Sequence, residues 1–108
     1  MRTRRWRTSD AALQLLGLAA RAGAVVAGTQ PVRERVRAGA VRFALVATDL
    51  TPTGRDKLVP LLEGRNVPFV VRYERVELGR AVGKSPLATV GVVDSGFAER
   101  LVALLDDE

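Results

Sequence analysis

Short apolar runs alternate along this chain with segments whose apolar residues recur every three or four positions. Because short apolar runs bounded by turn residues are typical of buried strands, the pattern predicts strands at residues 24–27, 43–47, 69–71 and 88–93. The periodic segments predict helices at residues 11–21, 29–38, 53–63, 74–82 and 95–105. Since the strands are apolar on both faces, helices should cover both sides of the sheet. We therefore expect an α/β fold, a three-layer α/β/α sandwich with a roughly four-stranded mixed sheet.

Polar residues indicate where three of these helices begin. Thr29 or Gln30 lies near the cap of the second helix, and Pro31 suits its first turn because an N–H there has no intrahelical acceptor. Thr53, with an acidic residue three positions later, has the spacing of a capping box for the third helix. Ser95 is of the type that caps helices, so it predicts the start of the last one.

The chain has 108 residues, which is enough for one domain with a single core and too few for two. We expect that domain at residues 9–105, between a flexible basic N-terminal arm at residues 1–8 and an acidic tail at residues 106–108. The arm contains four arginines and Trp6. It could be a solvated tail, or it could clamp RNA with Trp6 stacked on a base.

The arginines of the arm and the apolar residues after them imitate a secretory signal. Gln14 interrupts the apolar run and Arg21 ends it, so the run is shorter than the roughly 18 apolar residues of a membrane helix. We therefore expect a cytoplasmic protein with no membrane segment.

The charge of the chain favours a polyanionic partner. Seventeen Lys and Arg residues against twelve Asp and Glu residues give a net charge of +5 and a pI of about 11.0. Without the arm and the tail, thirteen basic and nine acidic residues remain, a net +4. Only Lys57 and Lys84 are lysines, and the guanidinium fork of the arginines suits phosphates and guanine edges. The preference for Arg could also reflect no more than a biased codon composition.

The chain contains no Cys and no His. It can therefore form neither a disulfide, nor a Cys/His zinc site, nor a catalytic pair of Ser or Cys with His. Asp49 is a candidate carboxylate, but its surroundings are explained more simply by a helix start. We expect a non-enzymatic protein without a cofactor.

The loop around Lys84 is the clearest candidate for a phosphate contact. It pairs Gly79 and Gly83 with Arg80, Lys84 and a serine just before an apolar run. The glycine spacing is one residue short of a nucleotide-binding P-loop, and a strand follows where that motif needs a helix. The loop is thus better suited to a polymeric phosphate backbone than to a nucleotide.

The helix predicted at residues 29–38 has one basic outward face. At 100° per residue, Arg33, Glu34 and Arg37 fall within about 60° of Gln30, opposite the valines of the apolar face. A helix N-terminus and outward arginines on one face suit a phosphate backbone. The simpler alternative is a solvated amphipathic helix.

Five motifs occur in a familiar order. They are Gly28-Thr29-Gln30, Ala44-Leu45-Val46-Ala47-Thr48-Asp49 with Pro52, Val67-Pro68, Glu77-Leu78-Gly79-Arg80-Ala81-Val82-Gly83, and Asp94-Ser95-Gly96-Phe97-Ala98. With them the chain resembles the kink-turn RNA-binding ribosomal proteins, the L-seven-Ae-like superfamily, and most closely its small bacterial YlxQ-like branch. The resemblance covers residues 11–105. It implies an α/β/α sandwich that binds structured RNA with the N-terminus of the second helix and the loop before the last strand.

The helix signature of that superfamily reads Gly-x-Asn-Glu-x-x-Lys. Here the glycine is kept and Gln30 can imitate Asn, but Pro31 replaces the Glu that accepts a guanine proton, and Glu34 replaces the Lys. Arg33 or Arg37 could supply the cation instead, with Gln30 on a base edge, and an altered RNA target is equally compatible.

These observations lead to one expected function and two alternatives. We expect a monomeric protein that binds structured RNA, either kink-turn-like or ribosomal. Its partner would be ribosomal RNA, the ribosome or another structured RNA. The expected RNA-binding residues are Gly28, Thr29, Gln30, Arg33, Arg37, Arg80, Gly83, Lys84, Ser85, Pro86 and Leu87. The main alternative is a protein-interaction module on the same fold, with weak or no specific RNA binding. A weaker one is a nucleotide-handling enzyme built on Gly83, Lys84 and Ser85.

Overall fold

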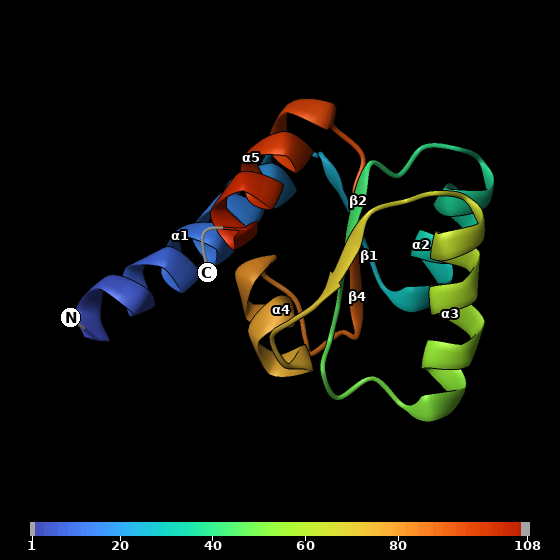
Figure 1. Cartoon of the computed structure of the whole chain (residues 1–108), viewed down its shortest axis with the longest axis horizontal. Helices are drawn as coiled ribbons and strands as arrows, with labels where there is room; N and C mark the ends of the chain where they lie inside the picture. The colour runs from blue at the N-terminus through green and yellow to red at the C-terminus, as the bar shows by residue number, and fades with distance from the viewer. Residues whose placement is uncertain (1, 107–108) are drawn as a thin grey trace.

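Five helices and a four-stranded sheet form three layers in the computed structural model (Figure 1), which describes residues 2–106 and the side chains from Ala11 onward. The elements are α1 (Arg2–Arg21), β1 (Val25–Ala27), α2 (Thr29–Arg37), β2 (Phe43–Val46), α3 (Pro52–Gly64), β3 (Phe69–Val71), α4 (Arg75–Ala81), β4 (Thr89–Val92) and α5 (Ser95–Asp106). Helices α1, α4 and α5 cover one face of the sheet, and α2 and α3 cover the other. The predicted α/β/α sandwich is confirmed, and each strand lies within its predicted range.

The sheet has the strand order β1-β4-β2-β3. Strand β4 is antiparallel to both β1 and β2, whereas β2 and β3 are parallel, so the sheet is mixed as expected. Ala27 at the end of β1 pairs with Val90, and Val46 at the end of β2 pairs with Thr89. The start of β4 therefore lies at the same edge of the sheet as the ends of β1 and β2.

Two apolar cores lie on the two faces of the sheet because successive strand residues point to opposite sides. In β2, Phe43 and Leu45 contribute to the core under α1, α4 and α5, whereas Ala44 and Val46 contribute to the core under α2 and α3. The largest fully buried helix side chains are Leu16, Leu78 and Leu101 in the first core and Val32, Val36, Leu58 and Leu62 in the second. Burying a side chain of this size stabilises the fold by roughly 1.5–3 kcal/mol.

Helix α1 includes residues 2–8, which the sequence pattern predicted as a flexible arm. The choice between a solvated tail and an RNA clamp depends on side chains, among them that of Trp6, which lie outside the described part of the chain. In the tail, α5 continues through Asp106, and residues 107–108 are not described. Within residues 2–106, no helix is both long enough and apolar enough to cross a membrane.

Two helix caps differ from the sequence prediction. Thr51, not Thr53, caps α3: its Oγ1 accepts a hydrogen bond from the Gly54 N–H at 3.1 Å. The last helix is capped by an Asp94 oxygen that accepts from the N–H of Phe97 at 2.9 Å, and Ser95 is its first residue. Both predictions were wrong for one reason: a second capping residue stands nearby, and only the backbone geometry decides between the two.

Candidate nucleic-acid interface

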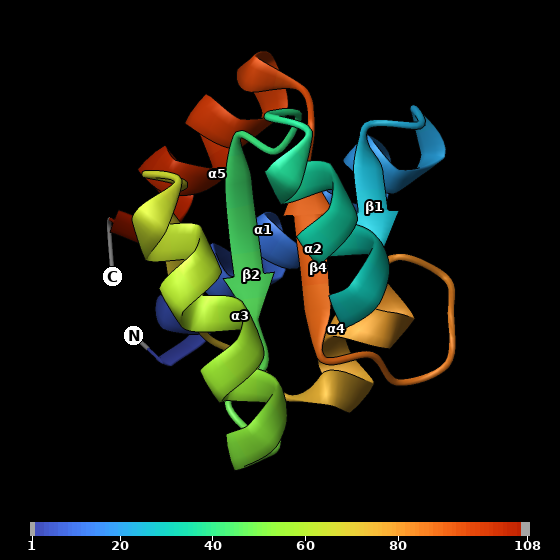
Figure 2. The ribbon, with the colours of Figure 1, turned by 90° about the vertical axis from the view of Figure 1, so that its right-hand side faces the viewer.

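The two segments expected to bind RNA meet at the edge of the sheet where β4 begins. The Gly28 N–H donates to the Thr89 carbonyl at 2.8 Å, and the hydroxyls of Thr29 and Thr89 are 2.9 Å apart. Thr89 is fully buried and is the first residue of β4, directly after the loop at residues 83–88. Figure 2 shows this loop beside the start of α2. We call this area the α2–loop surface: residues 28–33 together with the loop at residues 83–87.

Gly28 is the N-cap residue of α2, and its backbone has φ 105° and ψ 149°, a conformation that is essentially restricted to glycine. A Cβ at this position would also lie 3.3 Å from Cδ of Pro31. Of the four N–H positions at a helix start, that of Gly28 is bonded to β4 and Pro31 has none. The N–H groups of Thr29 and Gln30 therefore remain as the two donors of this helix end.

The outward face of α2 agrees with its sequence pattern. Val32 and Val36 are buried, while Gln30, Glu34 and Arg37 are exposed. Arg33 is half-buried and its Nη1 donates to Gln30 Oε1 at 2.8 Å. This bond occupies the amide oxygen of Gln30 and leaves the amide NH₂ as a donor. In the described part of the chain, Nε of Arg33 is buried without a hydrogen-bond partner.

Arg37 lies at the other end of α2. It is eight residues from Thr29, so about 12 Å separates the two along the helix axis. Its carbonyl accepts a hydrogen bond from Nη1 of Arg65 at 3.0 Å. The structure thus places Arg37 on the predicted face but away from the start of the helix.

The loop at residues 83–87 is held against α4. The Lys84 N–H donates to the Gly79 carbonyl at 2.8 Å, and the Leu87 N–H donates to the Arg75 carbonyl at 3.2 Å. A Cβ on Gly79 would lie 2.7 Å from the carbonyl carbon of Ser85, so only glycine lets the loop pass this closely. The side chains of Lys84, Ser85 and Pro86 are exposed. Strand β4 follows the loop, as the sequence predicted, and three of the loop N–H groups, those of Gly83, Lys84 and Leu87, are used within the protein, unlike those of a P-loop.

An ion pair that sequence analysis did not find lies next to this loop and holds Arg75, a residue to which the loop is bonded. Asp49, in the connection from β2 to α3, accepts the Arg75 N–H at 3.0 Å on Oδ1, and its Oδ2 lies 3.4 Å from Arg75 Nε. Arg75 in turn accepts the bond from Leu87. Desolvation acts to raise the pKa of Asp49, but hydrogen bonds from backbone N–H groups and the Arg75 side chain outweigh it, so the pKa lies below its ordinary value.

Asp49 was interpreted from the sequence as part of a helix start, but the helix cap is Thr51, and Asp49 joins two loops instead. No sequence signal identifies this pair, because its members are 26 residues apart.

Arg80 is the predicted site residue that lies apart from α2. It is exposed on α4, where it lines a surface hollow between α1 and α4. Gly28, Thr29, Gln30 and Arg33 are gathered at one end of α2, and Gly83 to Leu87 form the loop beside it. Among the side chains that the structure describes, those of residues 11–106, no group of acidic residues is arranged to hold a metal ion.

Comparisons with known proteins show what this chain is similar to. The model of the ribosomal protein L7Ae/L30e/S12e/Gadd45 family matches residues 10–102. RNA-binding protein YlxQ of Bacillus subtilis is 36% identical over 92 residues, which are 85% of this chain and 92% of that protein. Large ribosomal subunit protein eL8 of Thermoplasma volcanium is 33% identical over 94 residues, which are 86% and 78% of the two chains.

Two solved structures share the fold. A Bacillus halodurans protein of unknown function has a TM-score of 0.84 and 37% sequence identity, covering 88% of this chain and 96% of that one. The Giardia lamblia 15.5kD RNA binding protein has a TM-score of 0.79 at 21% identity, covering 94% and 89%. At that identity the second likeness shows the fold alone.

Proposed function

This chain belongs to the ribosomal protein L7Ae/L30e/S12e/Gadd45 family, and we propose that it binds structured RNA, of the kink-turn or ribosomal kind, through the α2–loop surface. The family match agrees with the resemblance seen in the sequence, and the family is non-enzymatic. Relatives named as an RNA-binding protein and as a large-subunit ribosomal protein support RNA as the partner. No catalytic step is assigned.

The observation that carries this proposal is the contact of Gly28 and Thr29 with Thr89. It joins the start of α2 to the start of β4 by a backbone hydrogen bond at 2.8 Å and a hydroxyl pair at 2.9 Å. Two basic segments that are about fifty residues apart in sequence thereby form one surface. Without this contact, each segment would be an ordinary solvated helix start or loop.

Each part of the surface suits a different group of RNA. The free N–H groups of Thr29 and Gln30, at the positive end of the α2 dipole, are suited to a phosphate or a base acceptor. The amide NH₂ of Gln30, held by Arg33, is suited to an acceptor on a base edge. Lys84, exposed on the loop, is suited to the phosphate backbone.

Two residues that differ from the helix signature of the family affect which RNA this protein can recognise. Pro31 has neither an N–H nor a side-chain acceptor, and Glu34 places an exposed negative charge on the outward face of α2. The Gln30–Arg33 pair lies beside both, so we propose that Arg33 supplies the cation in place of the missing Lys and that Gln30 offers its amide NH₂ to a base edge, while Pro31 leaves the place of the Glu without an acceptor. Recognition of tandem G·A pairs would then depend on the Gln30 amide rather than on a carboxylate.

The test compares two RNAs, one with a kink-turn and one in which its tandem G·A pairs are replaced by Watson–Crick pairs, each titrated at two salt concentrations. We expect tighter binding to the intact kink-turn. Changing Arg33, Arg37 and Lys84 together to Ala should remove most binding and lower the log–log salt slope by roughly 0.7–0.9 for each phosphate that is no longer bound. Equal, salt-sensitive binding to both RNAs would contradict kink-turn recognition, and an unchanged slope in the triple variant would contradict the site.

A further inference from the structure

The hollow that Arg80 lines, between α1 and α4, lies on the opposite side of the sheet from α2. It has a volume of about 650 Å³ and a floor of small and apolar residues that includes Gly17 and Ala81. Arg21 on α1 and Arg80 on α4 line it, together with one carboxylate, Glu77. Neither arginine belongs to the α2–loop surface.

Contacts within α1 and α4 place Arg21 over this floor. A Cβ at Gly17 would lie 2.9 Å from the carbonyl oxygen of Ala81, so the two helices approach closely here. The same Cβ would lie 3.8 Å from Nη1 of Arg21, which shows that the guanidinium folds back over Gly17. Among the described residues, neither Arg21 nor Arg80 forms an ion pair. Two arginines that form no ion pair with any described residue thus border one hollow, with the single carboxylate of Glu77.

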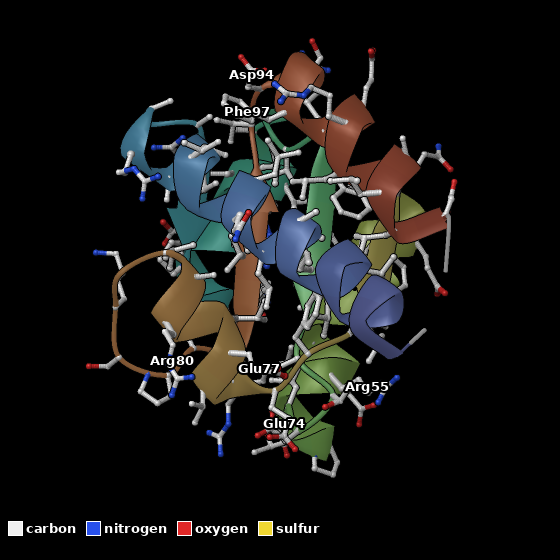
Figure 3. The ribbon with its side chains drawn as sticks, turned by 90° about the vertical axis from the view of Figure 1, so that its left-hand side faces the viewer. Arg55, Glu74, Glu77, Arg80, Asp94 and Phe97 are labelled. Atoms are coloured by element: carbon white, nitrogen blue, oxygen red, sulfur yellow. The ribbon has the colours of Figure 1, made fainter. Side chains whose placement is uncertain are left out.

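The hollow is continuous with the loop of the α2–loop surface. The Gly83 N–H donates to the Arg80 carbonyl at 3.2 Å, so Arg80 lies directly before the loop that carries Lys84. Figure 3 shows Arg80 beside this loop and Glu77 with Glu74 toward the other end of α4. The Glu77 carboxylate accepts the Glu74 N–H at 2.9 Å, which directs it toward the start of the helix. Positive charge therefore extends from Lys84 to Arg80 and Arg21 and ends at Glu77.

We propose that the hollow between α1 and α4 binds the phosphate backbone of an RNA segment that continues beyond the part held at the α2–loop surface. The inference rests on the proposed function and extends its footprint. Arginine suits this role because its guanidinium binds phosphate oxygens in a bidentate manner. Continuity with Lys84 favours the same RNA over an acidic protein segment, and a floor of small and apolar residues leaves room for a backbone without selecting a base sequence.

The experiment compares a minimal kink-turn RNA with the same RNA in which each stem in turn is extended by one helical turn. The full chain is tested as wild type and as the double variant Arg21→Gln/Arg80→Gln. For one extended RNA, we expect the double variant to bind about five- to thirtyfold more weakly at low salt, with a salt slope lower by roughly 1.4–1.8. Its affinity for the minimal RNA should fall by less than about twofold, the loss expected from removing the charge of Arg80 beside the loop.

A matched control removes the same charge elsewhere. Arg35 and Arg42 are exposed, and the Arg42 N–H donates to Val92 at the far end of β4 from Thr89. Arg35→Gln/Arg42→Gln should leave all affinities within about twofold, because electrostatic effects fall off over a Debye length. Glu77→Gln keeps an acceptor for the Glu74 N–H and removes the opposing charge. It should therefore tighten binding to the extended RNA about two- to threefold.

Two outcomes would overturn the inference while the proposed function stands. In one, Arg21→Gln/Arg80→Gln binds the extended RNAs as tightly as the wild type does. The hollow would then not bind RNA, and an acidic protein segment would become the favoured ligand. In the other, the double variant loses affinity for the minimal and extended RNAs equally. If the wild type binds neither the minimal nor the extended RNAs, the proposed function fails, and the inference fails with it.

Discussion

Replacing Gly28 by Ala tests whether the start of α2 is both a stability element and a binding element. The backbone at Gly28 has φ 105° and ψ 149°, which an L residue adopts at a cost of about 1–3 kcal/mol. The new methyl would also lie 3.3 Å from Cδ of Pro31. A domain of this size loses about 4 °C in Tm per kcal/mol, so a loss of about 2 kcal/mol lowers Tm by roughly 8 °C.

Binding should fall as well, because the strain changes the direction of the two free N–H groups at Thr29 and Gln30. A hydrogen bond to a charged group contributes about 1.5 kcal/mol, so losing one weakens RNA binding about tenfold. The measurements are a thermal melt followed by circular dichroism and a titration with the kink-turn RNA, below the Tm of the variant.

Gly39 provides the matched control at the other end of α2. It also has a positive φ, 74°, but a Cβ there meets nothing within 4 Å. Gly39→Ala should cost about 1 kcal/mol, or roughly 4 °C, and leave the affinity for RNA unchanged. The reasoning is refuted if the two variants lose the same affinity, or if Gly28→Ala melts and binds like the wild type.

Three further changes test single contacts. Thr89→Val keeps the volume and removes the hydroxyl pair with Thr29, so urea unfolding should show a loss of about 1 kcal/mol, and an unchanged midpoint would contradict this. Asp49→Asn should loosen the loop at Arg75 and weaken RNA binding. The folded-state pKa of Asp49 lies below 3.8, so the contribution of its carboxylate to stability is present above pH 3.8 and is lost as the pH falls through the folded-state pKa. The difference in Tm between the wild type and Asp49→Asn should therefore shrink as the pH falls through this range. A constant difference in Tm would argue against the ion pair. Lys84→Ala should lower the salt slope of RNA binding by roughly 0.7–0.9 with no change in Tm, and an unchanged slope would remove Lys84 from the surface.

The layers and strands could be predicted because burial on both faces leaves a continuous apolar run in each strand. Phe43 to Val46 is such a run, and all four of its side chains are buried. The residues that cap the starts of α3 and α5 could not be predicted in this way. Thr51 and Thr53 flank a proline that fits the first helical position, and either threonine could cap a helix by its chemistry alone.

Part of the site could be predicted from local spacing and part could not. Gln30, Arg33 and Arg37 share a face because of helical geometry, and Lys84 stands in a recognisable loop. The contact between Gly28 and Thr89 and the pair of Asp49 with Arg75 depend instead on which strands are neighbours, which local spacing does not encode. The same holds for Arg80, which adjoins the loop in sequence but also lines the hollow against α1.

The hydrogen bonds that hold the loop at residues 83–87 to α4 have a consequence for the rate of association. A segment that is already held by Gly79 and Arg75 carbonyls loses little conformational freedom when a ligand arrives. Encounter, rather than a folding step, should then limit association, so the on-rate should rise as salt is lowered while the off-rate changes little. The heat-capacity change should likewise correspond to the contact area alone, without the additional burial of a segment that folds upon binding.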